Sequence, residues 1–189
     1  MRALTYYVGA TLDGFIADVD GAFDFLPVEQ DVMQAMAAEM PETFPAQARE
    51  HFGVTDVPNK RFDTVLMGRA TYEPALLAGI ASPYPHLRQV VFSRTLTGTD
   101  LEVEVVAGDA ADAVRDLKRE DGMDIWLCGG GALAGQLLAE IDELVLKRYP
   151  LVLGSGIPLF AGPCDLTGFA PAVTHSFDSG VAVTTYTRR

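Results

Sequence analysis

Short apolar runs alternate with stretches of helical periodicity along most of the chain. The first apolar run, Tyr6 to Ala10, predicts a strand, and turn signals follow it at Asp13-Gly14 and Asp20-Gly21. Later apolar runs predict five more strands, with a turn at Thr97-Gly98 between the second and the third. They cover residues 64–67, Gln89 to Ser93, Glu102 to Ala107, Ile125 to Cys128 and Glu143 to Leu153, the last interrupted by Pro150.

Three helices are predicted between these strands, besides the one that begins after Gly68. The first covers Val28 to Met40 and ends at Pro41; its apolar residues at helical spacing are Val28, Val32, Met36 and Ala37. Asp109 is suited to cap a second helix that runs through Arg119, and the third covers Ala132 to Ile141. Residues 41–60 contain three prolines and mixed polarity. We expect a lid or an irregular surface segment there, with at most one short helix.

The order of these elements predicts an α/β fold in a single domain, residues 1–189. Strands that alternate with helices favour a mainly parallel central sheet flanked by helices. The chain then ends in two β segments, Ala172 to Phe177 and Val181 to Thr187, with Asp178-Ser179-Gly180 between them. This spacing predicts a hairpin, and therefore an antiparallel edge at the C-terminal side of the sheet.

Charge and composition exclude several classes of partner. The formal net charge is -12, which disfavours binding to nucleic acid or to anionic membranes. No apolar run approaches the roughly 20 residues that a membrane span requires, so we expect a cytoplasmic protein. Cys128 and Cys164 lack metal-ligand spacing, and no metal is expected. Any anionic ligand must therefore be bound by a local cluster of arginines.

A candidate phosphate site follows the strand at residues 64–67. Gly68 allows a tight turn and a close approach of the backbone to a ligand. Arg69 offers a planar fork of donors that suits a phosphate, and Thr71 can cap the following helix and donate to a phosphate oxygen.

Two further strand ends repeat this design. One is followed by Ser93 and Arg94, and the other by Gly129, Gly130, Gly131 and Ala132. Three strands can therefore direct their carboxyl ends to one ligand, which indicates a nucleotide. The glycines also fit the G-x-G-x-x-A fingerprint of a Rossmann fold, but that fold needs an acidic residue about 20 positions further on. The chain has Lys147, Arg148 and Tyr149 there, which argues against it.

The motifs, in their order along the chain, resemble the dihydrofolate reductase superfamily. They read Thr-Leu-Asp-Gly-Phe-Ile-Ala from Thr11, Met-Gly-Arg-Ala-Thr-Tyr-Glu from Met67, Phe-Ser-Arg from Phe92 and Cys-Gly-Gly-Gly from Cys128. The segment from Asp142 to Phe160 is similar to the branch that includes the reductase domain of the bifunctional riboflavin-biosynthesis deaminase-reductase. The resemblance implies a dihydrofolate reductase-like three-layer sandwich, and in that branch a homodimer.

The resemblance also implies a bound NADPH. It assigns Arg69 and Thr71 to cofactor phosphates and Ser93 and Arg94 to the adenosine 2′-phosphate, and it implies a cis peptide between Gly129 and Gly130. Positive charge at the 2′-phosphate favours NADPH over NADH. The other residues that the resemblance assigns to the cofactor are Ala10, Ile16, Ala17, Gly68, Gly131 and Ala132.

The substrate is less well defined by the sequence. Asp13, in the Leu-Asp-Gly motif, and Asp31, on the first predicted helix, are the candidate catalytic carboxylates, and Asp24 is a third acid nearby. Asp13 also has a structural interpretation as a turn residue, and Asp31 as a solvated or capping residue. We expect hydride transfer from NADPH to a small heterocyclic or carbonyl substrate, including the ribosylamino-pyrimidine phosphate of riboflavin biosynthesis. The alternatives are a true dihydrofolate reductase, although the first loop has Phe23 and Phe25 and lacks a tryptophan, and a non-catalytic NADP-binding protein.

Overall fold

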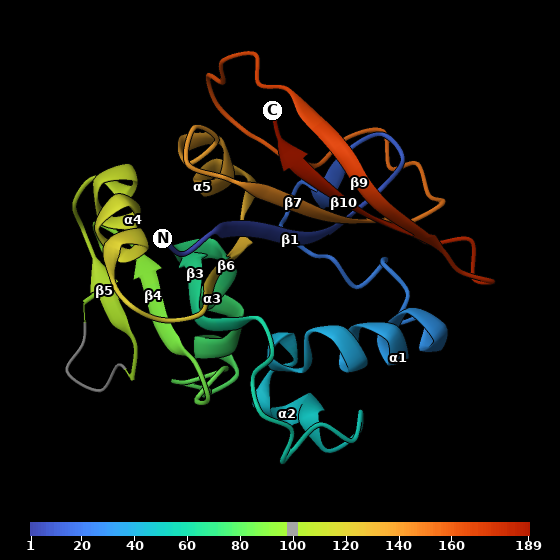
Figure 1. The fold of residues 1–189 in the computed structure, drawn as a ribbon, viewed down its shortest axis with the longest axis horizontal. Helices are drawn as coiled ribbons and strands as arrows, with labels where there is room; N and C mark the ends of the chain where they lie inside the picture. The colour runs from blue at the N-terminus through green and yellow to red at the C-terminus, as the bar shows by residue number, and fades with distance from the viewer. Residues whose placement is uncertain (98–101) are drawn as a thin grey trace.

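The structure is a computed structural model that describes residues 1–97 and 102–189 (Figure 1). The predicted turn at Thr97-Gly98 lies partly outside the described residues. The strands are β1 (Leu4–Ala10), β2 (Phe15–Ala17), β3 (Phe62–Gly68), β4 (Arg88–Phe92), β5 (Glu104–Val106), β6 (Asp124–Gly129), β7 (Glu143–Arg148), β8 (Ile157–Pro158), β9 (Phe169–Ser176) and β10 (Ala182–Arg188). The helices are α1 (Gln30–Glu39), the 3-10 helix η1 (Pro41–Thr43), α2 (Ala46–Arg49), α3 (Arg69–Leu77), α4 (Ala110–Arg119) and α5 (Gly131–Gln136).

Eight strands of the described chain form one sheet in the order β5-β4-β3-β6-β1-β7-β10-β9. Each pairing from β5 to β7 is parallel, whereas β10 is antiparallel to both β7 and β9. The predicted parallel sheet with an antiparallel C-terminal hairpin is therefore confirmed. The short β2 and β8 form a separate two-stranded sheet, which the sequence pattern did not predict.

Helices cover both faces of the sheet and make three layers. Successive side chains of β3 point to opposite faces of the sheet. Val65 and Met67 pack into the core beneath α1 and α3, and Leu66 packs into the core beneath α4 and α5. In Figure 1, α1 and α2 lie below the sheet and α5 lies above it. The dihydrofolate reductase-like sandwich predicted from the resemblance is the observed architecture.

Several predicted element ends are wrong, most of them by one to three residues, and the larger differences are at α5 and β7. The first helix begins at Gln30, and Val28 lies outside it with 73% of its surface exposed. Helix α5 stops at Gln136, and Leu137 and Ile141 are buried in the segment after it. Strand β7 stops at Arg148, before Pro150, which cannot donate to the ladder. The Asp109 cap is confirmed, since its carboxylate accepts from the Asp112 N–H at 3.0 Å.

The segment 41–60 is more ordered than predicted. Glu42 is fully buried, and Arg49 of the same segment is also buried. The Glu42 carboxylate accepts from the main-chain N–H groups of Lys60, Arg61 and Phe62. Arg49 donates to the carbonyls of Pro41, Val54 and Val57. Buried charges that are fully hydrogen-bonded fix the surrounding backbone, so this segment forms η1, α2 and a packed turn.

Candidate functional site

A single large cavity lies at the carboxyl ends of the parallel strands, where α/β sheets bind ligands. Its volume is about 1390 Å³, larger than the roughly 300–1,000 Å³ of ordinary ligand pockets. The strand ends that reach it include Gly9 of β1, Gly68 of β3, Phe92 of β4, Cys128 of β6 and Lys147 of β7. The space is sufficient for a dinucleotide together with a second molecule.

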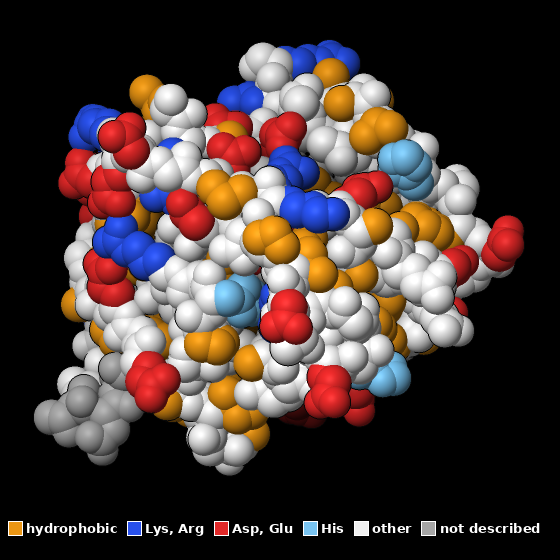
Figure 2. Space-filling view, turned by 60° about the horizontal axis from the view of Figure 1, so that its bottom comes forward, with side chains coloured by type: hydrophobic (Ala, Val, Ile, Leu, Met, Phe, Trp, Pro, Cys, Tyr) orange, Lys and Arg blue, Asp and Glu red, His pale blue; other side chains and the backbone are white. Residues whose placement is uncertain are grey.

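The cavity is locally cationic in an acidic protein. Among the described residues that line it, the cations are Arg69, Arg94 and Lys147, and the carboxylates are Asp24 and Asp109. The face shown in Figure 2 carries acidic, basic and apolar side chains scattered among one another. Two of the predicted arginines, Arg69 and Arg94, thus line the same cavity.

Most of the predicted cofactor residues meet in this cavity. Those that line it are Ile16, Ala17, Gly68, Arg69, Thr71, Ser93, Arg94, Gly130, Gly131 and Ala132. Ala10 is buried at the end of β1, and Gly129 precedes the lining residues of the glycine segment. The structure thus brings the ends of β3, β4 and β6 to one surface, although about sixty residues of chain lie between the end of β3 and the end of β6.

The end formed by β3 and β4 carries the phosphate-type donors. Gly68 is the N-cap of α3, and no side-chain hydrogen bond caps this helix, so the predicted capping role of Thr71 is wrong. The Thr71 hydroxyl instead faces Gly129 and Gly130, 3.7 and 3.5 Å from where a Cβ on these glycines would stand. Arg69 donates to the Thr95 hydroxyl and to Glu73 at the rim of the cavity.

The glycine segment after β6 has the predicted backbone. The peptide bond between Gly129 and Gly130 is cis, and Gly129 has a φ of 140°. A Cβ on Gly131 would overlap the carbonyl oxygen of Pro158, so β8 lies directly against the start of α5. Only glycine fits at this contact, and the main chain of the segment is left open toward the cavity.

The opposite end of the cavity contains an ammonium group among aromatic rings. Lys147 pairs with Gly9 of the neighbouring β1, and its Nζ lies 4.6 Å from the centroid of the Tyr7 ring. Burial lowers the pKa of Lys147, but the phenol groups of Tyr7 and Tyr149 raise it and prevail, so the pKa lies above its ordinary value. Burial raises the pKa of the neighbouring Cys128 thiol to about 12, which keeps it protonated.

Apolar side chains form the rest of this end. They come from the loop before α1, from α1 itself, from the η1–α2 segment and from β6, and include Phe23, Leu26, Met33, Phe44, Phe52 and Trp126. Trp126 is 3% exposed and stacks edge-on against Tyr84, with ring centroids 5.0 Å apart. A flat apolar molecule fits these walls.

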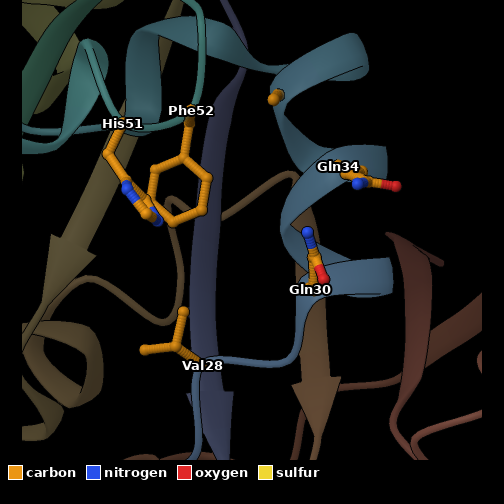
Figure 3. A pocket seen from close by; sticks show the side chains of 6 residues that line it. Val28, Gln30, Gln34, His51 and Phe52 are labelled. Carbon is orange, nitrogen blue, oxygen red and sulfur yellow. The ribbon is translucent and has the colours of Figure 1, made fainter.

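A second cavity of about 450 Å³ adjoins the first, between α1 and the segment after α2 (Figure 3). Val28 and Phe52 line both cavities and separate them. The polar groups of the smaller cavity are Gln30 and Gln34 on α1 and His51 on the other side.

Neither predicted catalytic carboxylate lines the large cavity. Asp13 accepts from the Thr11 hydroxyl and from the main-chain N–H groups of Leu153 and Gly154. Asp31 accepts from the Ser179 N–H and so joins α1 to the C-terminal hairpin. Both carboxylates therefore hold main-chain segments together, and of the three candidate acids only Asp24 lines the cavity.

Sequence reasoning missed the Lys147 cluster. In the sequence, Lys147 and Tyr149 served only as evidence against a Rossmann fold, and Tyr7 was considered only as part of a predicted strand. A charged residue directly after the apolar run Leu144 to Leu146 was the available signal. The missing information was the parallel pairing of β7 with β1, which brings Lys147 over Tyr7.

Sheet order, three-layer packing and a dinucleotide-sized cavity at the strand ends define a dihydrofolate reductase-like domain. A family model of the RibD C-terminal domain matches residues 2–183, and the chain belongs to this family.

Comparisons with individual proteins agree with this assignment. The uncharacterised protein YwjB of Bacillus subtilis (strain 168) is 32% identical over 162 residues, which cover 84% of this chain and 83% of YwjB. A putative riboflavin biosynthesis protein from Shewanella sp. PV-4 superimposes with a TM-score of 0.75 at 27% identity, covering 100% of this chain and 99% of its own. A dihydrofolate reductase from Enterococcus faecalis, complexed with NADP(H) and RAB-propyl, gives a TM-score of 0.63 at 14% identity over 99% and 96% of the two chains. That likeness is one of fold.

No helix in the part of the chain that the structure describes is long and apolar enough to span a membrane.

Proposed function

We propose that the protein is an NADPH-dependent reductase that transfers hydride to a small heterocyclic or carbonyl substrate. One observation carries the proposal: a single cavity joins the phosphate-type donors after β3 and β4 to an apolar end with Lys147. A two-substrate reductase needs both regions in one enclosed space, so that the reacting atoms meet.

The residues that line the cavity fit NADPH. Arg69 and Thr71 would hold phosphate oxygens at the start of α3, and Ser93 and Arg94 would hold the 2′-phosphate that distinguishes NADPH from NADH. Gly130 has no side chain, so its main chain is open to the ligand. NADPH, when bound, supplies the hydride; the protein's residues orient the reactants and exclude water.

Cofactor binding tests the proposal first. Trp126 is the only tryptophan and lines the cavity, so its fluorescence reports on occupancy. Titration with NADPH is expected to quench this fluorescence at lower concentration than titration with NADH. Failure of both cofactors to bind would overturn the proposal.

Turnover then distinguishes a reductase from a binding protein. Loss of absorbance at the NADPH band with a carbonyl, pterin or pyrimidine acceptor is expected of the reductase. Tight NADPH binding with no oxidation by any acceptor would favour the non-catalytic alternative. Reduction of dihydrofolate faster than of every carbonyl acceptor would favour a true dihydrofolate reductase.

We also propose a cytoplasmic homodimer. Strand β9 is an edge of the sheet, and six of its eight residues are exposed. An exposed edge strand offers unpaired main-chain groups that a second copy can cover. Light scattering at micromolar concentration is expected to give twice the chain mass, and a monomer mass would contradict the proposal.

A further inference from the structure

The substrate end of the cavity is poor in groups that bind phosphate. Its wall is formed largely by aromatic and aliphatic side chains, and its one cation among the described lining residues is Lys147. Arg69 belongs to the other end: its guanidinium donates to Thr95 and Glu73, on the side of β4. β7 and β3 are three positions apart in the sheet, about 14 Å at roughly 4.8 Å per strand. Lys147 and Arg69 are therefore placed for different ligand groups.

Lys147 is held in position by its neighbours on β1. Its Cε comes within 3.8 Å of where a Cβ on Gly9 would stand, and the Tyr149 ring comes within 3.0 Å of the same point. Gly9 thus lets both side chains lie over β1 beside the Tyr7 ring. The position of the ammonium is fixed by packing and by its contact with the face of that ring.

Lys147 also has no carboxylate partner. It takes part in none of the ion pairs of the described residues, whereas Lys118 pairs with Asp142 at 2.6 Å. An ammonium that borders an apolar cavity without a counter-ion has lost part of its hydration. A ligand oxygen that accepts a hydrogen bond from this ammonium would replace the lost hydration.

We propose that the substrate is a flat, largely apolar carbonyl compound without a phosphate, and that Lys147 binds the carbonyl oxygen and gives it a proton. This inference rests on the proposed reductase function and narrows its substrate class. The aromatic walls hold the body of the molecule, and Lys147 fixes the one polar atom. A phosphorylated sugar, as in a ribosylamino-pyrimidine, would find only the single charge of Lys147 for its phosphate among the described residues that line this end.

The reaction balances as a carbonyl reduction. The carbonyl carbon accepts hydride from C4 of the bound nicotinamide, the carbonyl π bond breaks, and its electron pair goes to the oxygen. The oxygen takes a proton from the Lys147 ammonium, which water then reprotonates. NADPH is oxidised to NADP⁺, and the carbonyl compound is reduced to an alcohol.

Naphthoate, naphthyl phosphate and naphthaldehyde are suitable probes. They share one flat apolar body and differ in the group presented to Lys147. Calorimetric titration of the protein with NADP⁺ present is expected to show naphthoate binding more tightly than naphthyl phosphate. Naphthaldehyde is expected to be reduced with consumption of NADPH. Tighter binding of the phosphate would overturn the proposed substrate class.

Two variants test the role of Lys147. Lys147→Met is expected to weaken naphthoate binding by about tenfold or more, since it removes a charged hydrogen bond, while NADPH affinity is retained. Lys147→Arg keeps the charge but cannot release a proton, so naphthoate binding is expected to persist while naphthaldehyde turnover falls by about 100-fold. Lys60→Met, at an exposed lysine that does not line the cavity, is the matched control.

The outcomes separate the two proposals. Failure of the wild-type protein to bind NADPH would contradict the reductase function itself. Retained NADPH binding with naphthoate affinity unchanged in Lys147→Met, or with turnover unchanged in Lys147→Arg, overturns only the role of Lys147. Where the methionine variant does not fold, the arginine variant decides.

Discussion

The carboxylate of Asp13 accepts a hydrogen bond of 2.7 Å from the main-chain N–H of Gly154. The Thr11 hydroxyl donates to the same carboxylate at 2.6 Å. These donors, first Thr11 and then Gly154, lower the pKa of Asp13 to about 2 because they stabilise the ionised form. This carboxylate joins the loop after β1 to the loop after β7. The first of these loops leads into β2, whose residues Ile16 and Ala17 line the cavity.

Substitution of Asp13 distinguishes a loop-fixing residue from a catalytic one. Asp13→Ala is expected to weaken NADPH binding several-fold, because the loop that leads into β2, with Ile16 and Ala17, loses its attachment. A catalytic carboxylate would instead lose turnover at unchanged NADPH affinity. Fluorescence titration and initial rates on the same preparation decide between them, and Asp20→Ala, an exposed acid of the following turn, serves as the control.

Arg94 is expected to determine cofactor preference. Arg94→Ala should weaken NADPH binding by about tenfold, the effect of losing one charged hydrogen bond to a phosphate, and leave NADH binding unchanged. The measurement is the ratio of the two dissociation constants. Arg119→Ala removes an exposed arginine that pairs with Asp116 on α4, and should leave the ratio unchanged. An unaltered ratio in Arg94→Ala would place the 2′-phosphate elsewhere.

The parts of the fold that were predicted correctly depend on local patterns. The buried runs of β3 and β6, and the Asp109 cap of α4, are each decided by neighbouring residues in sequence. The burial of Glu42 could not be predicted from neighbouring residues in this way. Its burial depends on amide donors from residues 60–62, which only the tertiary structure brings to it.

The same distinction between local sequence and tertiary structure holds for the candidate site. Gly68, Arg69 and Ser93 follow strands directly, so a strand prediction already places them at the cavity. Lys147 reaches the cavity through the pairing of β7 with β1, strands more than a hundred residues apart in the sequence. Asp13 was misleading for another reason: an Asp-Gly pair looks the same in a sequence whether it turns the chain or acts on a substrate.

Gly131 is expected to be essential for the contact between α5 and β8. Gly131→Ala would gain helix propensity of about 1 kcal/mol, but the new Cβ would overlap the Pro158 carbonyl, and strain of this kind costs about 1–3 kcal/mol. We expect a net loss of stability, measured as a lower denaturation midpoint in urea. Gly108→Ala is the matched control, because a Cβ there would meet no atom within 4 Å. A midpoint in Gly131→Ala as high as that of the control would contradict this reading of the contact.

His86 is expected to make stability depend on pH. Burial lowers the pKa of His86 below its ordinary value of 6.5, and its Nε2 lies 2.8 Å from the Glu42 carbonyl oxygen. The unfolded chain therefore binds a proton at this ring more readily than the folded chain between the lowered pKa and 6.5. The free energy of unfolding must fall as the pH is lowered through that window and level off below it. His86→Gln removes the titrating ring and should flatten this part of the curve, whereas His175→Gln, on exposed β9, should not. Urea unfolding of the three proteins from pH 8 to pH 5 is the measurement, and parallel curves for wild type and His86→Gln would show that His86 carries none of the dependence.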